Sequence, residues 1–513
     1  MLKKLLSMIV QKEIRKISYP EQSSSDEIKL KEQPIHINLD KNIQTFSAIF
    51  SIPENVDAKI RNVEINGIQK KAALLYISSI SDTKIIEDNV IKPFQKNVDS
   101  SKKIRDLISA EYFTTEHKIK DVLEGVTKGN TALFVEGENI AYMINAANFQ
   151  GRNIEKPENE VSLKGPKEAF NEKAMTNISL IRKKIKSENL VVESFVIAKR
   201  SKNEVFIAYI KDIANDDLLK RVKEKVNALD VDSVQNISEL ETLIEERKLS
   251  LFPTILHTER PDRVAHFLEE GYVVLLMENS PSSLVMPATF WSFYHTADDR
   301  YFRFLFANFT RALRIAALFI TLFTSAIYVS VTNFHAEMVP PDLLLAIAST
   351  REKVPFPAFI EVIMMEIAFE LIREAGLRVP SPIGPTIGIV GALILGQAAV
   401  SANIVSPIVV IVVALGGLSS FAIGDLSLNY TIRLSRFLFI LSAGMFGFYG
   451  MTALFMIGLY YIVSLKSFGV PYLAPYTPKY ISSNDTIFRR LSKNEFFRPG
   501  YLKPKDIQKK SGD

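Results

Sequence analysis

Four glutamates recur at helical spacing in one strongly apolar part of the chain. They are Glu361, Glu366, Glu370 and Glu374, within the interval 357–375. At about 100° per residue the last three fall on one face of a helix. Carboxylates at membrane depth cost free energy unless they face water, a partner or a cavity. One interpretation is an interfacial helix with a wet face. The other is an acidic vestibule, formed by the first three, that attracts cations.

A short polar run, GQAAVSAN at 396–403, follows in an otherwise apolar stretch. Its small residues let helices approach closely, and Gln397, Ser401 and Asn403 need hydrogen-bond partners or water. In one interpretation these side chains join helices to one another. In the other they line a pore built from several copies around a symmetry axis, with Val400 beside them as an apolar constriction that gates by dewetting.

Charged residues also cluster outside the apolar half of the chain, in the segment ERPDRV at 259–264. A proline suits the first turn of a helix, so we expect a helix to begin in this segment. The charges then have two interpretations. They form a cap and surface ion pairs, or they make an interdomain contact through Glu259, Arg260, Asp262 and Arg263.

The residue types that most enzymes need are scattered or missing. The chain has no cysteine, which excludes disulfides, thiol catalysis and cysteine-bound metal. Its six histidines stand singly, and there is no phosphate-binding Gly-Lys motif and no nucleophile elbow. We therefore expect no catalytic residue, no metal site and no cofactor. A net charge of +5, without a basic and aromatic patch, does not favour nucleic-acid binding either.

The elements that position these acidic and polar residues are apolar helices in a predicted membrane domain, 299–465. No charged residue occurs between Val379 and Gly424, and this length accommodates two spans of about 20 residues each. We expect an amphipathic acidic helix at 357–375 and four spans, at 315–334, 383–400, 404–424 and 437–465.

Basic residues indicate the orientation of these spans. Four arginines precede the first span, and the tail after residue 465 is basic. The positive-inside rule then places both ends of the membrane domain in the cytoplasm, which requires an even number of spans. Arg433 and Arg436 fit four spans poorly, because they would lie outside. If the helix 357–375 also spans, there are five spans and the tail lies outside.

The first part of the chain is charged, and its patterns alternate between strand and helix. The predicted fold class is therefore an α/β N-terminal soluble region followed by an all-α polytopic membrane domain. Outside the membrane domain we expect a flexible segment at 1–35, α/β subdomains at 36–157 and 158–298, and a basic tail at 466–513.

The two soluble subdomains share one order of patterns. Helix, glycine, strand, turn and strand occur in this order at 121–144 and again at 265–287. Either the subdomains arose by internal duplication, or a common α/β hairpin recurs by chance.

A set of motifs runs through most of the chain. In order they are GPKEAF at 165–170, NISLIRKKI at 177–185, LFPTILHTERPDRV at 251–264, the run from PFPAF through EAGLRVP to GQAAV at 355–400, and SFGVPYLAPY at 467–476. This set resembles the A subunit of the GerA-type spore germinant receptors, in the GerA spore germination protein family. The resemblance covers about residues 120–476, and the run at 355–400 is specific to that family.

The resemblance implies a multi-pass protein of the inner spore membrane, with its N-terminal domain on the cytoplasmic, or core, side. It also implies a homo-oligomeric ring in contact with membrane lipid, for which the family suggests a pentamer. The implied partners are a permease-like B subunit that binds the germinant and a lipoprotein C subunit.

The function that the resemblance implies is a germinant-gated cation channel that opens at the start of spore germination. Two alternatives stay open. One is a non-conducting scaffold or signal-transducing subunit for the B and C subunits. The other is a related paralogue linked to dipicolinate release.

Overall fold

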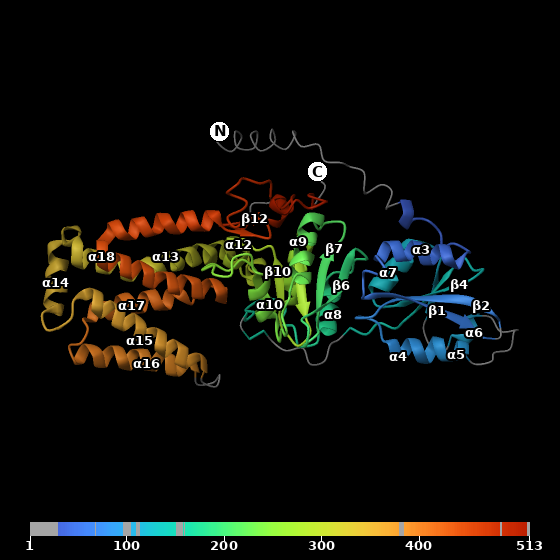
Figure 1. The fold of residues 1–513 in the computed structure, drawn as a ribbon, viewed down its shortest axis with the longest axis horizontal. Coiled ribbons are helices and arrows are strands. Elements are labelled where there is room, and N and C mark those ends of the chain that lie inside the picture. Colours follow the sequence, from blue (N-terminus) through green and yellow to red (C-terminus); the bar gives the residue numbers. More distant parts are fainter. Residues whose placement is uncertain are drawn as a thin grey trace. The chain divides into compact units, whose positions relative to one another are not determined.

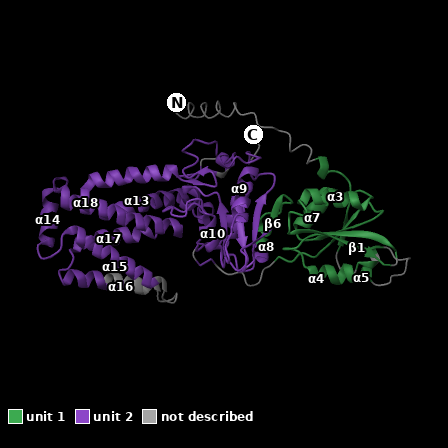
Figure 2. Cartoon of the chain, viewed as in Figure 1, with its two compact units in different colours: residues 1–152, 178–193 green, residues 153–177, 194–513 purple. Residues whose placement is uncertain are grey.

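A computed structural model describes residues 29–66, 68–95, 104–108, 113–149, 157–158, 160–378, 384–482 and 485–509. The chain divides into two compact units, one within residues 1–152 and 178–193 and the other within 153–177 and 194–513 (Figure 2). Residues 178–193 belong with the first unit, and in it the buried Arg182 side chain pairs with Asp57 at 2.9 Å. Each unit is described by itself.

The first unit is a five-stranded antiparallel sheet, in the order β1-β2-β4-β5-β3, with helices on both faces (Figure 1). Helices α3 and α7 pack on one face through residues such as Phe46 and Val122, and α4, η1, α5 and α6 cover the other. The elements are α3 (Leu39–Phe50), β1 (Ala58–Ile65), β2 (Lys70–Ile77), α4 (Thr83–Ile86), the π-helix η1 (Glu87–Ile91), α5 (Lys92–Gln95), α6 (Ile104–Leu107), β3 (Phe113–Glu116), α7 (Ile119–Thr127), β4 (Thr131–Val135) and β5 (Ala141–Ile144).

The next sheet has the strand order β6-β7-β9-β10-β8, which is the order of the first sheet repeated. The glycines in the repeated pattern, Gly129 and Gly271, have φ of 95° and 97°, a conformation that favours glycine after each helix. The common order fits the duplication that the sequence suggested. The elements are α8 (Ala174–Lys184), β6 (Leu190–Ile197), β7 (Asn203–Ile210), α9 (Asp216–Asn227), α10 (Ile237–Ile244), β8 (Leu256–Thr258), α11 (Pro261–Glu269), β9 (Val273–Met277) and β10 (Ser283–Met286).

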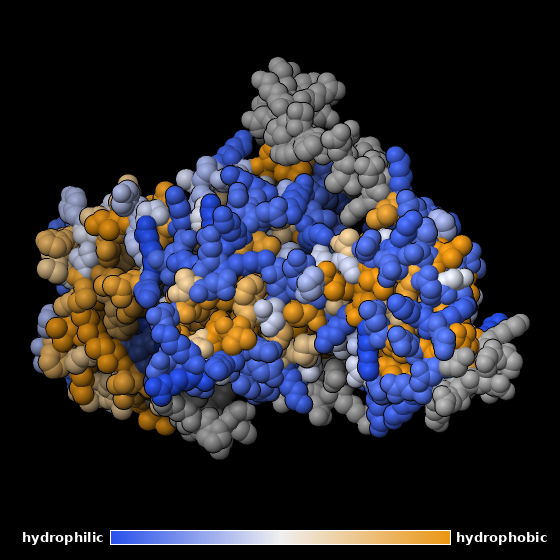
Figure 3. Space-filling model, turned by 45° about the vertical axis from the view of Figure 1, so that its right-hand side comes forward, coloured by the Kyte–Doolittle hydropathy of each residue, from blue (hydrophilic) through white to orange (hydrophobic). Residues whose placement is uncertain are grey.

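A helical bundle follows, so the predicted fold class is confirmed. Its surface carries many exposed apolar side chains, and Figure 3 shows hydrophobic residues gathered over it. By length and composition, α13 and α18 could each cross a membrane. The elements are α12 (Phe290–Tyr294), η2 (Ala297–Arg300), α13 (Phe304–Phe334), η3 (Ala336–Met338), α14 (Pro341–Arg351), α15 (Ala358–Arg378), α16 (Gly384–Ser401), α17 (Pro407–Ser420) and α18 (Leu426–Ser464).

The long element α18 is two antiparallel halves, because the backbone leaves the helical conformation at Gly447, with φ 59° and ψ −143°. The Thr431 hydroxyl donates to Leu251 O at 2.7 Å, and the Tyr461 hydroxyl lies 3.1 Å from Ser250 Oγ. A straight helix would separate Thr431 from Tyr461 by about 45 Å. The interval 437–465, predicted as one span, therefore contains a reversal.

Helices α13, α15, α16, α17 and the two halves of α18 make six segments that run between the two ends of the bundle, within the described residues. The four spans that hydropathy predicted stay a prediction; α15 carries charges, and α18 folds back inside the interval predicted as the last span. The number is even, and the tail returns to the second sheet, where Tyr501 and Tyr272 hydroxyls lie 2.7 Å apart. The tail contains β11 (Lys466–Ser467), β12 (Val470–Pro471), η4 (Ser492–Asn494) and η5 (Gly500–Leu502).

The reversal predicts a strong sensitivity to substitution at Gly447. A Cβ there would lie 2.9 Å from His335 Nε2 and 3.0 Å from Phe334 Cβ, in a conformation that costs other residues about 1–3 kcal/mol. Gly447→Ala should therefore lower the melting temperature of the full chain in detergent micelles. Gly458→Ala is the matched control, because nothing lies within 4 Å of a Cβ there. Equal melting temperatures for the two variants would contradict the reversal.

Candidate functional site

The acidic residues singled out in the sequence lie on α15, and the chain supplies a partner for each of the first three. Glu361 is fully buried, receives a hydrogen bond from Ser406 N at 2.8 Å and pairs with Arg351 Nε at 3.2 Å. The carboxylate thus joins α15 to α14 and to the start of α17.

Glu366 and Arg436 form an ion pair at 2.7 Å in the middle of the bundle, with exposed side-chain fractions of 0% and 2%. The Ser325 hydroxyl donates to the other Glu366 oxygen at 2.6 Å. Three helical segments, α13, α15 and the first half of α18, therefore meet at one buried carboxylate. A buried ion pair is costly to break, because removing either partner leaves an uncompensated charge.

Glu370 lies one turn further along α15 and accepts hydrogen bonds from both Arg433 and Arg436, the latter at 2.9 Å. The Arg373 guanidinium donates to Gly417 O at 2.8 Å and lies 4.4 Å from the centre of the Phe421 ring. Carboxylates and arginines therefore alternate through this part of the bundle, each with a specific partner.

These ion pairs bear on the predicted cation vestibule, which stays a prediction. Its three carboxylates are balanced by arginines of the same chain, so the single chain has little free negative charge there. Arg433 and Arg436, which fitted a four-span topology poorly, are explained as partners of glutamates. The glutamates are on α15 and the arginines on α18, so no local spacing in the sequence pairs them.

The polar run lies at the end of α16 and in the turn that follows. Gln397, Ser401 and Asn403 are exposed in the single chain, and Asn403 has φ 52° in this turn. Val400 is partly buried against the core of the bundle. α16 packs against α15 at the edge of the bundle, so one of its faces is open (Figure 1).

The ERPDRV segment begins α11 and contacts the residues that precede α13. Arg260 pairs with Asp262 at 2.8 Å and with Asp298 at 3.2 Å, and the Tyr301 hydroxyl donates to Asp262 at 2.8 Å. Asp298 and Tyr301 lie in and just after η2. This part of the segment thus joins the second sheet to the start of the bundle.

The rest of the segment binds the residues that come just before and just after the second sheet. Arg263 pairs with Glu160 and donates to Ser292 O at 2.7 Å. Glu259 receives a hydrogen bond from Glu158 N at 3.0 Å. All four charged residues named from the sequence therefore take part in contacts between successive parts of the second unit.

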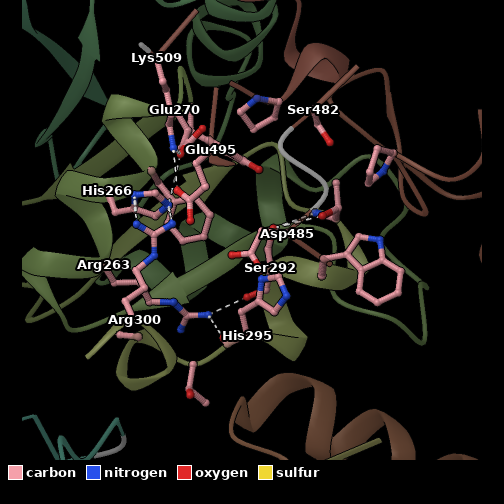
Figure 4. A pocket seen from close by; sticks show the side chains of 18 of the residues that line it. Arg263, His266, Glu270, Ser292, His295, Arg300, Ser482, Asp485, Glu495 and Lys509 are labelled. Atoms are coloured by element: carbon pink, nitrogen blue, oxygen red, sulfur yellow. Dashed lines mark hydrogen bonds and ion pairs between the residues drawn. The ribbon is translucent and has the colours of Figure 1, made fainter. Parts of the chain in front are cut away.

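A cavity of about 120 Å³ lies between α11, η2 and the tail, and it is lined by charged and aromatic side chains (Figure 4). Arg311 is one of the lining residues, with ion pairs to Asp299 at 3.0 Å and to Asp485 at 2.5 Å. Lys509 of the tail pairs with Glu270 of α11. Sequence reasoning missed this cavity. Its lining residues come from two parts of the chain, 262–311 and 475–509, and the sequence of most of the helical bundle lies between them.

Two histidines of this cavity are held neutral. Burial, together with Arg300 and Lys509, holds the pKa of His266 well below its usual range. Burial and Arg311 lower the pKa of His295 from 6.5 to about 4, while its Nε2 donates to Thr486 O at 2.5 Å. Protonation would place a further positive charge beside these arginines. The described residues hold no group of three or more His, Cys, Asp or Glu placed to bind a metal ion.

Comparisons with known proteins agree with one another. A family model described as Bacillus/Clostridium GerA spore germination protein matches residues 44–501. The chain is 38% identical to spore germination protein KA of Bacillus subtilis over 87% of this chain and 84% of that protein. It is 36% identical to spore germination protein B1 of the same organism, over 86% and 92% of the two chains.

One solved structure is also similar. It is the N-terminal domain of the A subunit of the Bacillus megaterium spore germinant receptor GerK3, at 28% identity and a TM-score of 0.40. The match covers 50% of this chain and 98% of that one.

The buried ion pair predicts a strong coupling between its two residues. Glu366→Gln and Arg436→Met should each destabilise the full chain by about 3–5 kcal/mol, and the double variant by less than the sum. Thermal unfolding in detergent micelles measures all three. Lys92→Met, which breaks the exposed pair with Asp88, is the control and should leave the melting temperature nearly unchanged. Strictly additive losses would mean that the two residues do not interact.

The neutral histidines predict a loss of stability in acid. A depressed folded pKa means that the unfolded chain binds the proton first, so the contribution of His295 is complete above about pH 6.5 and falls toward pH 4. The melting temperature should drop less between pH 7.5 and pH 5 in His295→Gln than in the wild type. Glutamine keeps a donor for Thr486 O and does not titrate. An equal drop in both proteins would exclude this role for His295.

Proposed function

Because this chain belongs to the GerA spore germination protein family, we propose that it is the A subunit of a spore germinant receptor. In this proposal it is an integral protein of the inner spore membrane. It works with a permease-like B subunit that binds the germinant and with a lipoprotein C subunit. The relatives are named as spore germination proteins, and that shared process supports the proposal.

The bundle is the part that enters the membrane in this proposal. Its exposed apolar side chains suit the hydrocarbon interior of a membrane. Its charged side chains Glu366 and Arg436 are buried and paired with each other, as charges within membranes usually are. The six segments return the chain to the end at which it entered. The arginines before α13 favour the cytoplasmic side for that end, and so for both soluble parts.

Several copies form a ring in this proposal, and α16 faces its axis. The observation that carries this step is that α16 lies at the edge of the bundle, where Gln397 and Ser401 are exposed. Polar groups at the surface of a membrane bundle need a polar neighbour or water. A shared aqueous path between copies supplies both, and cations released at the start of germination would pass through it.

One observation favours the second candidate, a non-conducting scaffold that transmits a signal between the other subunits. Val400 packs against the core of its own bundle in the single chain. A gate at this position requires Val400 to turn toward the axis on assembly, whereas a scaffold requires no change. The two candidates therefore differ in what substitutions at the end of α16 do.

The channel predicts opposite effects for two substitutions on α16. Val400→Ala widens and wets the constriction, so ions should leak without germinant. Gln397→Leu removes a polar group from the path and should reduce germinant-triggered ion efflux while assembly stays intact. Efflux is measured from liposomes that carry each variant together with the B and C subunits.

The control for both variants is Ile411→Ala, an exposed apolar position on α17, which should behave as the wild type. Wild-type efflux from both α16 variants, at equal protein level, would reject the pore and favour the scaffold.

A further inference from the structure

The loop between α10 and β8 presents one leucine wholly to the outside. Leu249 is 99% exposed, although neighbours on either side of it are held by hydrogen bonds. An isolated exposed leucine needs no explanation on an ordinary protein surface. The exposure of Leu249 does call for an explanation, because its loop lies against the helical bundle.

The loop is fastened to both halves of α18. Leu251 N donates to the Tyr461 hydroxyl at 3.2 Å, and Leu251 O accepts from Thr431. Arg247 donates to Ser464 O, at the last residue of α18, at 3.2 Å. A cation suits this place, because a helix end carries partial negative charge on its free carbonyls. Leu249 is therefore held beside the first turns of the first half of α18 and the last turn of its second half.

The outer surface of the second half of α18 is apolar up to this loop. Ile457, Tyr460 and Val463 are exposed there, with Tyr460 at 78%. Tyrosine is typical of the boundary between lipid tails and headgroups. The exposed apolar surface thus continues along the helix to its last turn, where the loop and Leu249 lie.

Basic side chains flank the leucine in a way that suits the same boundary. Lys248 precedes it, and Lys466 follows the end of α18; both are exposed. Long basic side chains extend their charge toward headgroup phosphates while their carbon chains stay among apolar groups. Of the two acidic residues before the loop, Glu245 accepts a hydrogen bond from the Thr254 hydroxyl at 2.7 Å, and Glu246 lies near Lys466.

We propose that the loop 247–251 is a membrane-surface contact, in which Leu249 inserts into the headgroup layer and the lysines bind its phosphates. This inference rests on the proposed insertion of the bundle into the membrane. It adds that the soluble domain touches the lipid surface directly, beside the helix ends, and is not joined to the membrane by the chain alone.

The test uses the absence of cysteine from the sequence. Single cysteines at Leu249, Tyr460 and Val196 are labelled with an environment-sensitive fluorophore in the full chain, in nanodiscs with and without brominated phospholipid. Val196 is the matched control, an exposed apolar residue on the edge strand β6, 64% exposed. We expect the brominated lipid to quench the labels at 460 and 249 several-fold more than the label at 196.

Each other outcome overturns the proposal for a separate reason. A label at 249 that iodide in water quenches as strongly as at 196 would place the loop in solution. A label at 249 shielded from both quenchers would mean that a protein surface covers it, such as a second copy. Water-like behaviour at 460 would show instead that the bundle is outside lipid, and the proposed membrane arrangement would fail with the loop contact.

Discussion

Two opposite charges buried in an apolar helix bundle are the constraint on which the rest of the bundle depends. Either charge alone would be costly there, since an unpaired charge away from water costs several kcal/mol. The pair therefore fixes α15 against the first half of α18, and Ser325 joins both to α13. α16 follows α15 and packs against it, so this ion pair, together with those of Glu361 and Glu370, helps to position the exposed polar residues of α16.

The same kind of contact joins the bundle to the soluble part of its unit. Arg260 binds Asp298, and Arg311 binds both Asp299 and Asp485. Burial alone would raise the pKa of Asp299, but Arg314 and Arg311 outweigh it and lower the pKa to about 2. Asp299 therefore stays charged at neutral pH. The ion pairs hold the second sheet, the first long helix and the tail together at one place.

The sequence predicted the parts of this structure that repeat or follow a local period. The motif resemblance to the GerA family is confirmed, and so are the α/β region and the helical part. The repeated pattern around Gly129 and Gly271 indicated two similar sheets, and the two sheets have the same strand order. Pairings across long stretches of chain could not be predicted, because nothing in a single sequence joins Glu366 to Arg436. The reversal was missed because Gly447 stands in an uninterrupted apolar run, and glycine is common in membrane helices without ending them.

The reversal at Gly447 also orders the completion of the fold in time. Since it returns the chain to the end of the bundle where α13 began, the tail can reach the second sheet only after the last helical half is in place. Tyr501 and Lys509, which close the charged cavity against Tyr272 and Glu270, are made after the helices. A growing chain therefore keeps this cavity open until every preceding helix has been synthesised. A closed cavity therefore indicates that all the helices of the bundle have been synthesised.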